Sequence, residues 1–132
     1  MTRFFLHKIK NYSTYVLHLR SNLFFMKSVI TCDLEGVIET INADGEKLFG
    51  YPKEELIGKK RVSLFSSGEV VIQNVGKWLS SAIKDGEHNT KTYFIRKDGS
   101  KFNAAIKITP TFKNGKNKPQ TGYCGITIPI NE

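Results

Sequence analysis

The chain is poor in the residues that build metal and disulfide sites. Its 132 residues include two cysteines and three histidines, and Cys32 and Cys124 lie far apart in the sequence. No Cys-x-x-Cys pair occurs, so we expect no metal site of cysteine and histidine ligands. The same low count argues against a small secreted domain that is held together by disulfides.

Long hydrophobic runs are also missing. No apolar stretch approaches the roughly 20 residues that a membrane-spanning helix needs. His7, Lys8 and Lys10 interrupt what would be the apolar core of a signal peptide. The hydrophobic share of 39% and the charged share of 24% are typical of a soluble globular protein, and the length suits one domain with a core. We therefore predict a cytoplasmic protein.

Acidic residues are absent before Asp33, whereas five basic residues precede it: Arg3, Lys8, Lys10, Arg20 and Lys27. Removing these five charges from the formal net charge of +8 leaves +3 on the rest of the chain. The basic character therefore belongs to the N-terminal segment rather than to the whole protein. The lysines at 59–60 and 113–118 have no interleaved aromatic residues, so we expect no nucleic-acid partner.

Patterns typical of catalysis are missing as well. Ser66 and Ser67 have no neighbouring histidine or acid pattern, and no Gly-x-Ser-x-Gly motif occurs. The lysine-rich stretch from Gly115 to Lys118 is not the glycine-rich turn between strand and helix that binds phosphates. The sequence therefore gives no reason to predict an enzyme.

The first 27 residues carry apolar side chains at the alternating spacing of four and three that is typical of a helix pairing with another helix. These positions are Phe5, Ile9, Tyr12, Val16, Leu19, Leu23 and Met26. The spacing predicts an N-terminal amphipathic helix over residues 1–27 and a homodimer that it stabilises. Two alternatives stay open: a basic helix on an anionic membrane surface, which the pattern favours less, and a segment without fixed structure or upstream of a true start at Met26.

From residue 29 onward the pattern predicts short strands and helices. Strands are expected at 29–32, 37–41, 90–97, 101–109 and 121–130, from β-branched residues bounded by turn residues. Helices are expected from Asn42 to Phe49, after Pro52, and over 68–85. The resulting order, β-β-α-α-α-β-β-β, predicts an α+β domain over residues 28–132, with five antiparallel strands and helices on one face.

Several motifs in this order resemble the PAS domain family of sensory and dimerisation modules. They are Asp33-Leu-Glu-Gly-Val-Ile38, Asn42, Leu48-Phe-Gly-Tyr51, Glu54-Glu-Leu-Ile-Gly-Lys59 and Arg96-Lys-Asp-Gly-Ser100. The resemblance covers roughly residues 28 to 130, and its specificity comes from the joint order of the motifs. In that arrangement the first and last strands lie side by side, so Cys32 and Cys124 should be near neighbours, as reduced thiols.

The resemblance also indicates which cofactors to expect. Flavin-binding light sensors of the family carry a cysteine in an Asn-Cys-Arg-Phe-Leu-Gln motif, which this chain lacks. Haem-binding members place a histidine on the long helix, whereas His88 follows the end of the helix predicted at 68–85. No cofactor is therefore required and haem is not expected, while a non-covalent flavin or a small apolar ligand stays open.

We expect a signal-sensing module with a pocket between the sheet and the helix at 68–85. The predicted ligand-binding residues are Asn42 as a polar contact and Phe49, Val75, Trp78, Leu79, Phe94 and Ile106 as apolar walls. Family members in signalling chains often end in Asp-Ile-Thr, whereas Pro129 stands where that Asp would be, so we expect the last strand to fray there. We expect no output domain within this chain, so the output would be a partner, self-association or another part of a longer protein. The alternative is a ligand-free adaptor that dimerises or docks a signalling partner through its N-terminal helix and outer sheet face.

Overall fold

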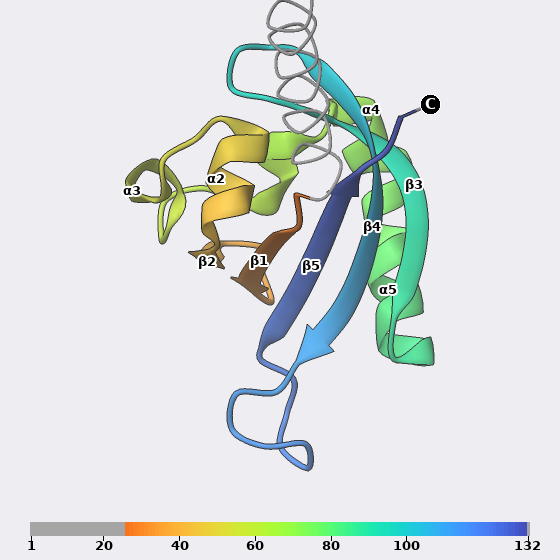
Figure 1. The fold of residues 1–132 in the computed structure, drawn as a ribbon. Helices are drawn as coiled ribbons and strands as arrows, with labels where there is room; N and C mark the ends of the chain where they lie inside the picture. The colour runs from red at the N-terminus through yellow and green to blue at the C-terminus, as the bar shows by residue number, and fades with distance from the viewer. Residues whose placement is uncertain (1–25, 132) are drawn as a thin grey trace, which may run out of the picture.

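A computed structural model describes residues 26–131, which form one antiparallel sheet with helices packed against it (Figure 1). The strands are β1 (Ser28–Asp33), β2 (Ile38–Ile41), β3 (His88–Ile95), β4 (Lys101–Thr111) and β5 (Gly122–Pro129). The helical segments are α2 (Ala43–Phe49), α3 (Lys53–Leu56), η1 (Val62–Phe65), α4 (Gly68–Val70), η2 (Val71–Val75) and α5 (Gly76–Asp85). The predicted α+β order of strands and helices is confirmed.

The strand order in the sheet is β2-β1-β5-β4-β3, and every neighbouring pair is antiparallel. The first and last strands are therefore neighbours near the middle of the sheet, as the family resemblance implied. Ser28 faces Thr127 and Asp33 faces Gly122 across this pair. Because side chains alternate between the two faces of a strand, this register decides which residues point toward the helices.

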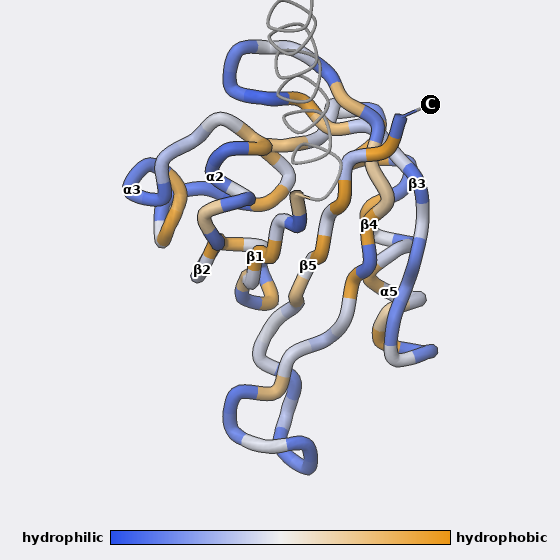
Figure 2. The backbone as a smooth tube through the Cα atoms, in the orientation of Figure 1, coloured by the Kyte–Doolittle hydropathy of each residue, from blue (hydrophilic) through white to orange (hydrophobic). Residues whose placement is uncertain are grey.

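The core lies between the inner face of the sheet and the helices. One cluster packs residues of α2, α3 and η1 against the strands, namely Leu48, Phe49, Leu56 and Phe65 against Ile30, Ile38, Phe94 and Ala104. A second cluster packs Ala82 of α5 against Cys32, Ile108 and Tyr123. Figure 2 shows hydrophobic residues along β1, β5 and β4, and a mostly hydrophilic loop that joins β4 to β5.

Two strands differ from the prediction at a proline. β4 runs to Thr111 rather than 109 and includes Pro110. β3 ends its pairing at His88 and Ile108, so Pro110 lies where β4 has a partner only in β5, and the missing N–H costs the sheet little there. β5 ends at Pro129, the residue at which the sequence predicted fraying, and beyond it the Ile130 amide still donates to the Asn103 carbonyl over 2.9 Å.

The helix predicted over 68–85 is present, but it contains a π-helical turn. Residues Val71–Val75 adopt this wider turn between α4 and α5, and the backbone stays right-handed on both sides. A π turn holds an extra residue, so it rotates everything after it about the helix axis relative to an uninterrupted α-helix. The turn therefore sets which side chains of α5 face the sheet.

The N-terminal helix and dimer predicted from residues 1–27 lie almost entirely outside the described residues. Phe5, Ile9, Tyr12, Val16, Leu19 and Leu23 are in the part that the structure does not describe. Met26 is described, and it is half-buried against the core cluster around Ile30 and Phe49. The dimer therefore stays a prediction.

Candidate functional site

A cavity of about 200 Å³ lies between the inner face of the sheet and the helix formed by η2 and α5. Its deeper walls are apolar and come from elements far apart in the sequence. They are Ile30 and Cys32 of β1, Phe49 of α2, Phe65 of η1, Val75, Trp78 and Leu79 of the long helix, Phe94 of β3, Ile106 and Ile108 of β4, and Tyr123, Gly125 and Thr127 of β5. The fold thus encloses a pocket at the place where the sequence predicted one.

Six of the seven predicted ligand-binding residues line this cavity: Phe49, Val75, Trp78, Leu79, Phe94 and Ile106. The strand residues were predicted from their alternation and the helix residues from their periodicity. The alternation in the first and last strands also contained the signal for Ile30, Cys32, Tyr123 and Thr127, which the prediction missed.

Asn42 does not line the cavity, contrary to its predicted role as a polar contact there. It is the N-cap of α2, and its Oδ1 accepts hydrogen bonds from the Gly45 and Val29 amides at 2.9 and 3.0 Å. Its Nδ2 donates to the Lys27 carbonyl at 2.8 Å. The side chain therefore ties α2 to the start of β1. An asparagine immediately before a helix is a typical N-cap, and that signal was in the sequence.

Replacing Asn42 with Ala should destabilise the fold without altering the cavity. An N-cap is worth about 0.5–2 kcal/mol, and each further hydrogen bond about 0.5–1.5 kcal/mol, so we expect a loss of about 2–3 kcal/mol. Urea unfolding followed by circular dichroism measures it. Asn114→Ala, in the exposed loop after β4, is the matched control and should change stability little. An Asn42→Ala protein as stable as the unmodified chain would contradict the capping role.

The mouth of the cavity is formed by the turn between β1 and β2 and by the segment around η1. Leu34, Glu35 and Gly36 of the turn face Arg61, Val62, Ser63 and Ser66. A carboxylate oxygen of Glu35 lies 3.8 Å from the Arg61 guanidinium, and both side chains are mostly exposed. Polar groups therefore gather at the opening, whereas the deeper walls are apolar.

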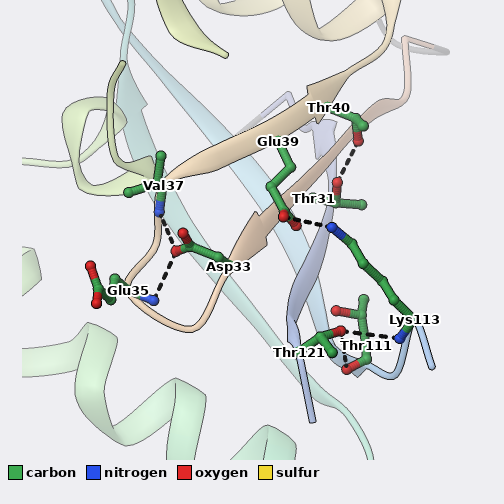
Figure 3. Close-up of polar contacts among 9 residues, drawn as sticks. All are labelled: Thr31, Asp33, Glu35, Val37, Glu39, Thr40, Thr111, Lys113 and Thr121. Atoms are coloured by element: carbon green, nitrogen blue, oxygen red, sulfur yellow. Dashed lines mark hydrogen bonds and ion pairs between the residues drawn. The ribbon is translucent and has the colours of Figure 1, made fainter. Parts of the chain in front are cut away.

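The turn at the mouth is fixed by its own residues. The Asp33 carboxylate accepts hydrogen bonds from the Glu35 and Val37 amides, both at 2.9 Å (Figure 3). Gly36 has φ of +86°, a conformation that residues with a Cβ rarely adopt. On the far side of this hairpin, Lys113 Nζ lies 2.6 Å from the Glu39 carboxylate and joins the β4–β5 loop to β2. The turn that forms one side of the mouth is therefore held in place by its own hydrogen bonds.

Trp78 occupies the side of the cavity that faces the start of β3. Its indole ring stacks on the His88 ring, with centroids 6.4 Å apart and an interplanar angle of 21°. His88 Nε2 is buried and has no hydrogen-bond partner among residues 26–131. His88 thus follows the long helix, as the sequence predicted, and packs on the wall residue Trp78.

The two cysteines are neighbours in the sheet but point to opposite faces. β1 and β5 pair Thr31 with Cys124 and Cys32 with Tyr123, so the thiols are one residue out of register. Cys32 is buried and lines the cavity, whereas Cys124 is half-buried on the outer face, and both are free thiols. The predicted proximity is confirmed. Burial raises the pKa of the Cys32 thiol to about 11, and burial also raises the pKa of Cys124.

Both thiols should therefore react slowly in the folded protein. At pH 8 the Cys32 thiol is almost fully protonated, because burial raises its pKa to about 11. An aromatic disulfide reagent should modify Cys32 slowly without denaturant and both cysteines rapidly in denaturant. After mild oxidation, mass spectrometry under denaturing conditions should still give the mass of the single chain with both thiols reduced. An intrachain disulfide between Cys32 and Cys124 would contradict the register.

Two features are absent from the described part of the chain. No group of three or more His, Cys, Asp or Glu side chains within residues 26–131 is arranged to hold a metal ion. Among the same residues, no helix is both long and apolar enough to cross a membrane.

Comparison with known proteins identifies the fold. A protein-family model described as "PAS domain" matches residues 26–126. Over 105 residues the chain is 30% identical to Two-component system protein A of Emericella nidulans, and the match covers 80% of this chain but only 15% of that protein. A PAS domain from Colwellia psychrerythraea superposes with a TM-score of 0.74 at 25% identity, over 87% of this chain and 97% of that one.

A more distant structure shares the fold at lower identity. It is a PAS domain of a LuxR-family transcriptional regulator from Burkholderia thailandensis, described as a complex with ethanol. It superposes with a TM-score of 0.64 at 13% identity, over 84% of this chain and 96% of that one. Both superposed structures share the arrangement of sheet and helices described above.

Proposed function

The chain belongs to the PAS domain family, and we propose that it is a signal-sensing module that binds a small apolar ligand in the cavity between the sheet and the long helix. Binding would fix the walls of the cavity, and the change would pass to a signalling partner or to another part of a longer protein. The module would act without catalysis and would need no resident cofactor.

The observation that carries this proposal is an apolar cavity with a polar mouth. An apolar cavity of about 150 Å³ in a protein core is large enough to bind benzene, so a volume of about 200 Å³ suits a molecule of one or two small rings or a short chain. A flavin, with three fused rings and a long polar tail, would need more space. The size thus favours a small apolar ligand over the flavin that the sequence left open.

The signalling context is supported by the relative in Emericella nidulans, which is named as a two-component system protein. Our chain spans 15% of that protein's length, so the rest of its activity does not transfer to this domain. Ethanol, described with the Burkholderia thailandensis neighbour, is also small and partly apolar. Both facts are compatible with a sensor of small molecules that reports to a partner.

Filling the cavity should abolish ligand binding and leave the fold intact. A Cβ at Gly125 would lie 3.7 Å from Ile106 Cδ1, an ordinary contact, so Gly125→Leu should place its side chain in the cavity. Indole and toluene should raise the melting temperature of the unmodified chain and shift the resonances of Trp78 and Leu79. At one hundred times the dissociation constant the stabilisation would be about 2.7 kcal/mol. Gly125→Leu should lose this response.

The matched control is Cys124→Leu, which adds an apolar side chain to the adjacent residue on the opposite face of the sheet. It should keep the response to both compounds. The proposal fails if neither compound changes the melting temperature of the unmodified chain, or if Gly125→Leu binds as well as the control. An absorption spectrum and native mass of the purified chain would separately reveal a ligand retained from the cell.

A further inference from the structure

The mouth of the inner cavity is charged, whereas its deeper walls are not. Among the described residues that line the cavity, two carry a charge, Glu35 and Arg61, and both lie at the opening. A charged group that entered the deeper part would lose its hydration without gaining an ion pair, which is costly. A ligand with an apolar body and one charged group would therefore hold that group at the mouth.

Arg61 is held beside the opening by contacts of its backbone. Val37 and Arg61 form an antiparallel bridge between the β1–β2 turn and the segment that leads into η1. The Val62 amide also donates to the Gly36 carbonyl over 2.9 Å. The guanidinium therefore extends from a fixed point at the rim of the cavity.

The contact with Glu35 leaves the Arg61 guanidinium largely available. The 3.8 Å between guanidinium and carboxylate is longer than a hydrogen bond, and the two side chains are 63% and 77% exposed. Such an exposed ion pair contributes little, because water and salt screen it. Figure 3 shows Glu35 on the turn, with its carboxylate pointing away from the Asp33 carboxylate that fixes the turn. A ligand group with better geometry can therefore take the place of Glu35.

The donors at the mouth favour an anion over a cation. An arginine presents five N–H donors in a planar fork, which matches the two oxygens of a carboxylate. Ser63 and Ser66 line the same side of the mouth as Arg61, and their hydroxyls can donate as well. On the opposite side, the lining residues next to Glu35 have no polar side chain. The mouth thus offers an anion several donors and a cation one exposed carboxylate.

Resting on the function proposed above, we propose that the ligand of this cavity is a small aromatic or short-chain carboxylate. Its apolar end fills the cavity, and its carboxylate binds the Arg61 guanidinium at the mouth. Arg61 thereby determines the preference for an anionic end group, and Ser63 and Ser66 add hydrogen bonds to it. Glu35 opposes the same ligand by like charge.

Three ligands of similar shape and different charge test this preference on the full chain. They are phenylacetate, the neutral phenylacetamide and the cationic 2-phenylethylamine, with toluene as the apolar reference. In calorimetric titrations we expect phenylacetate to bind at least about tenfold more tightly than phenylacetamide, and 2-phenylethylamine to bind most weakly. Added salt should weaken the binding of phenylacetate and leave that of toluene nearly unchanged. In the isotope-labelled chain, phenylacetate should shift the Arg61 Nε–H resonance.

Substitutions of the two charged residues should act in opposite directions. Arg61→Gln should weaken the binding of phenylacetate about tenfold and leave that of toluene unchanged. Glu35→Gln should strengthen the binding of phenylacetate severalfold, because it removes a like charge. The matched control is Lys60→Gln, which removes the same charge as Arg61→Gln from an adjacent exposed residue that does not line the cavity. This control should bind phenylacetate nearly as well as the unmodified chain.

The outcomes separate this proposal from the function on which it rests. If toluene binds but phenylacetate binds no better than phenylacetamide, the carboxylate is wrong and the apolar cavity still binds ligands. The carboxylate is also wrong if Arg61→Gln weakens toluene as much as phenylacetate, or if Glu35→Gln weakens phenylacetate. If neither toluene nor phenylacetate binds, both the carboxylate preference and the proposed function fail.

Discussion

Phe49→Ala is expected to remove most of the stability of this domain. Phe49 is 1% exposed, and its ring centroid lies 4.2 Å from that of Phe65 and 5.5 Å from those of Phe94 and Phe102. Replacing a buried phenylalanine with alanine typically costs about 3–5 kcal/mol, and three aromatic neighbours put this site at the upper end. Because small domains are stable by about 5–15 kcal/mol, the variant should be partly unfolded well below the melting temperature of the unmodified chain.

Urea unfolding followed by circular dichroism measures this effect, with the denaturant slope checked for a change in the unfolded state. The matched control is Phe112→Ala, because Phe112 is 40% exposed in the loop after β4. It should alter the free energy of unfolding by less than about 0.5 kcal/mol. Similar losses for both variants would show that the aromatic cluster around Phe49 is not the centre of the core.

Gly122→Ala should be almost as damaging, through a clash rather than a cavity. A Cβ at Gly122 would fall far inside contact distance of the Cys32 carbonyl oxygen, and it would lie 2.9 Å from the Cys32 carbonyl carbon and 3.0 Å from Asp33 Cα. All three are backbone atoms of β1, so no side-chain rotation relieves the overlap. The central strands must separate, and we expect a loss at or above the upper end of the roughly 1–3 kcal/mol that overpacking costs.

Gly76→Ala is the control for this substitution. A Cβ at Gly76 would have nothing within 4 Å, and the backbone there is right-handed helical. Alanine in a helix is favoured over glycine by about 0.5–1 kcal/mol, so this variant should gain stability. Thermal unfolding of the two proteins should therefore move in opposite directions. A Gly122→Ala protein with an unchanged melting temperature would contradict the close approach of β1 and β5.

The sequence predicts the sheet and most of the cavity because both follow from periodicity. Alternation in the strands and helical spacing from Val75 to Leu79 determine which side chains share a face, and the family resemblance supplied the neighbouring positions of β1 and β5. Given those, Phe94 and Ile106 must face the long helix. Five of the six predicted residues that line the cavity are of this kind, and the sixth is Phe49 of α2.

Features that depend on contacts across the fold were not predictable in the same way. No residue pattern distinguishes the π turn at Val71–Val75 from an ordinary α-helical turn, so the sequence does not predict how far α5 is rotated about its axis. Arg61 and Ser63 reach the cavity mouth because their segment folds back on the β1–β2 turn, where Val37 pairs with Arg61. The predicted role of Asn42 in the pocket was wrong for a different reason. A polar residue that lines a pocket and a polar residue that caps a helix look alike in the sequence. The position of Asn42 immediately before α2 favours the N-cap.

The pairing of β1 with β5 also determines how this domain can be joined to others. Ser28, near the point where the described chain enters the sheet, faces Thr127, two residues before β5 ends. The polypeptide thus arrives and departs at the same end of two adjacent central strands. A domain of this kind can be inserted into a longer chain, or repeated in tandem, without forcing its flanking segments apart. Because both flanking segments continue from these two strands, a small change of twist between β1 and β5 would change the direction of one segment relative to the other.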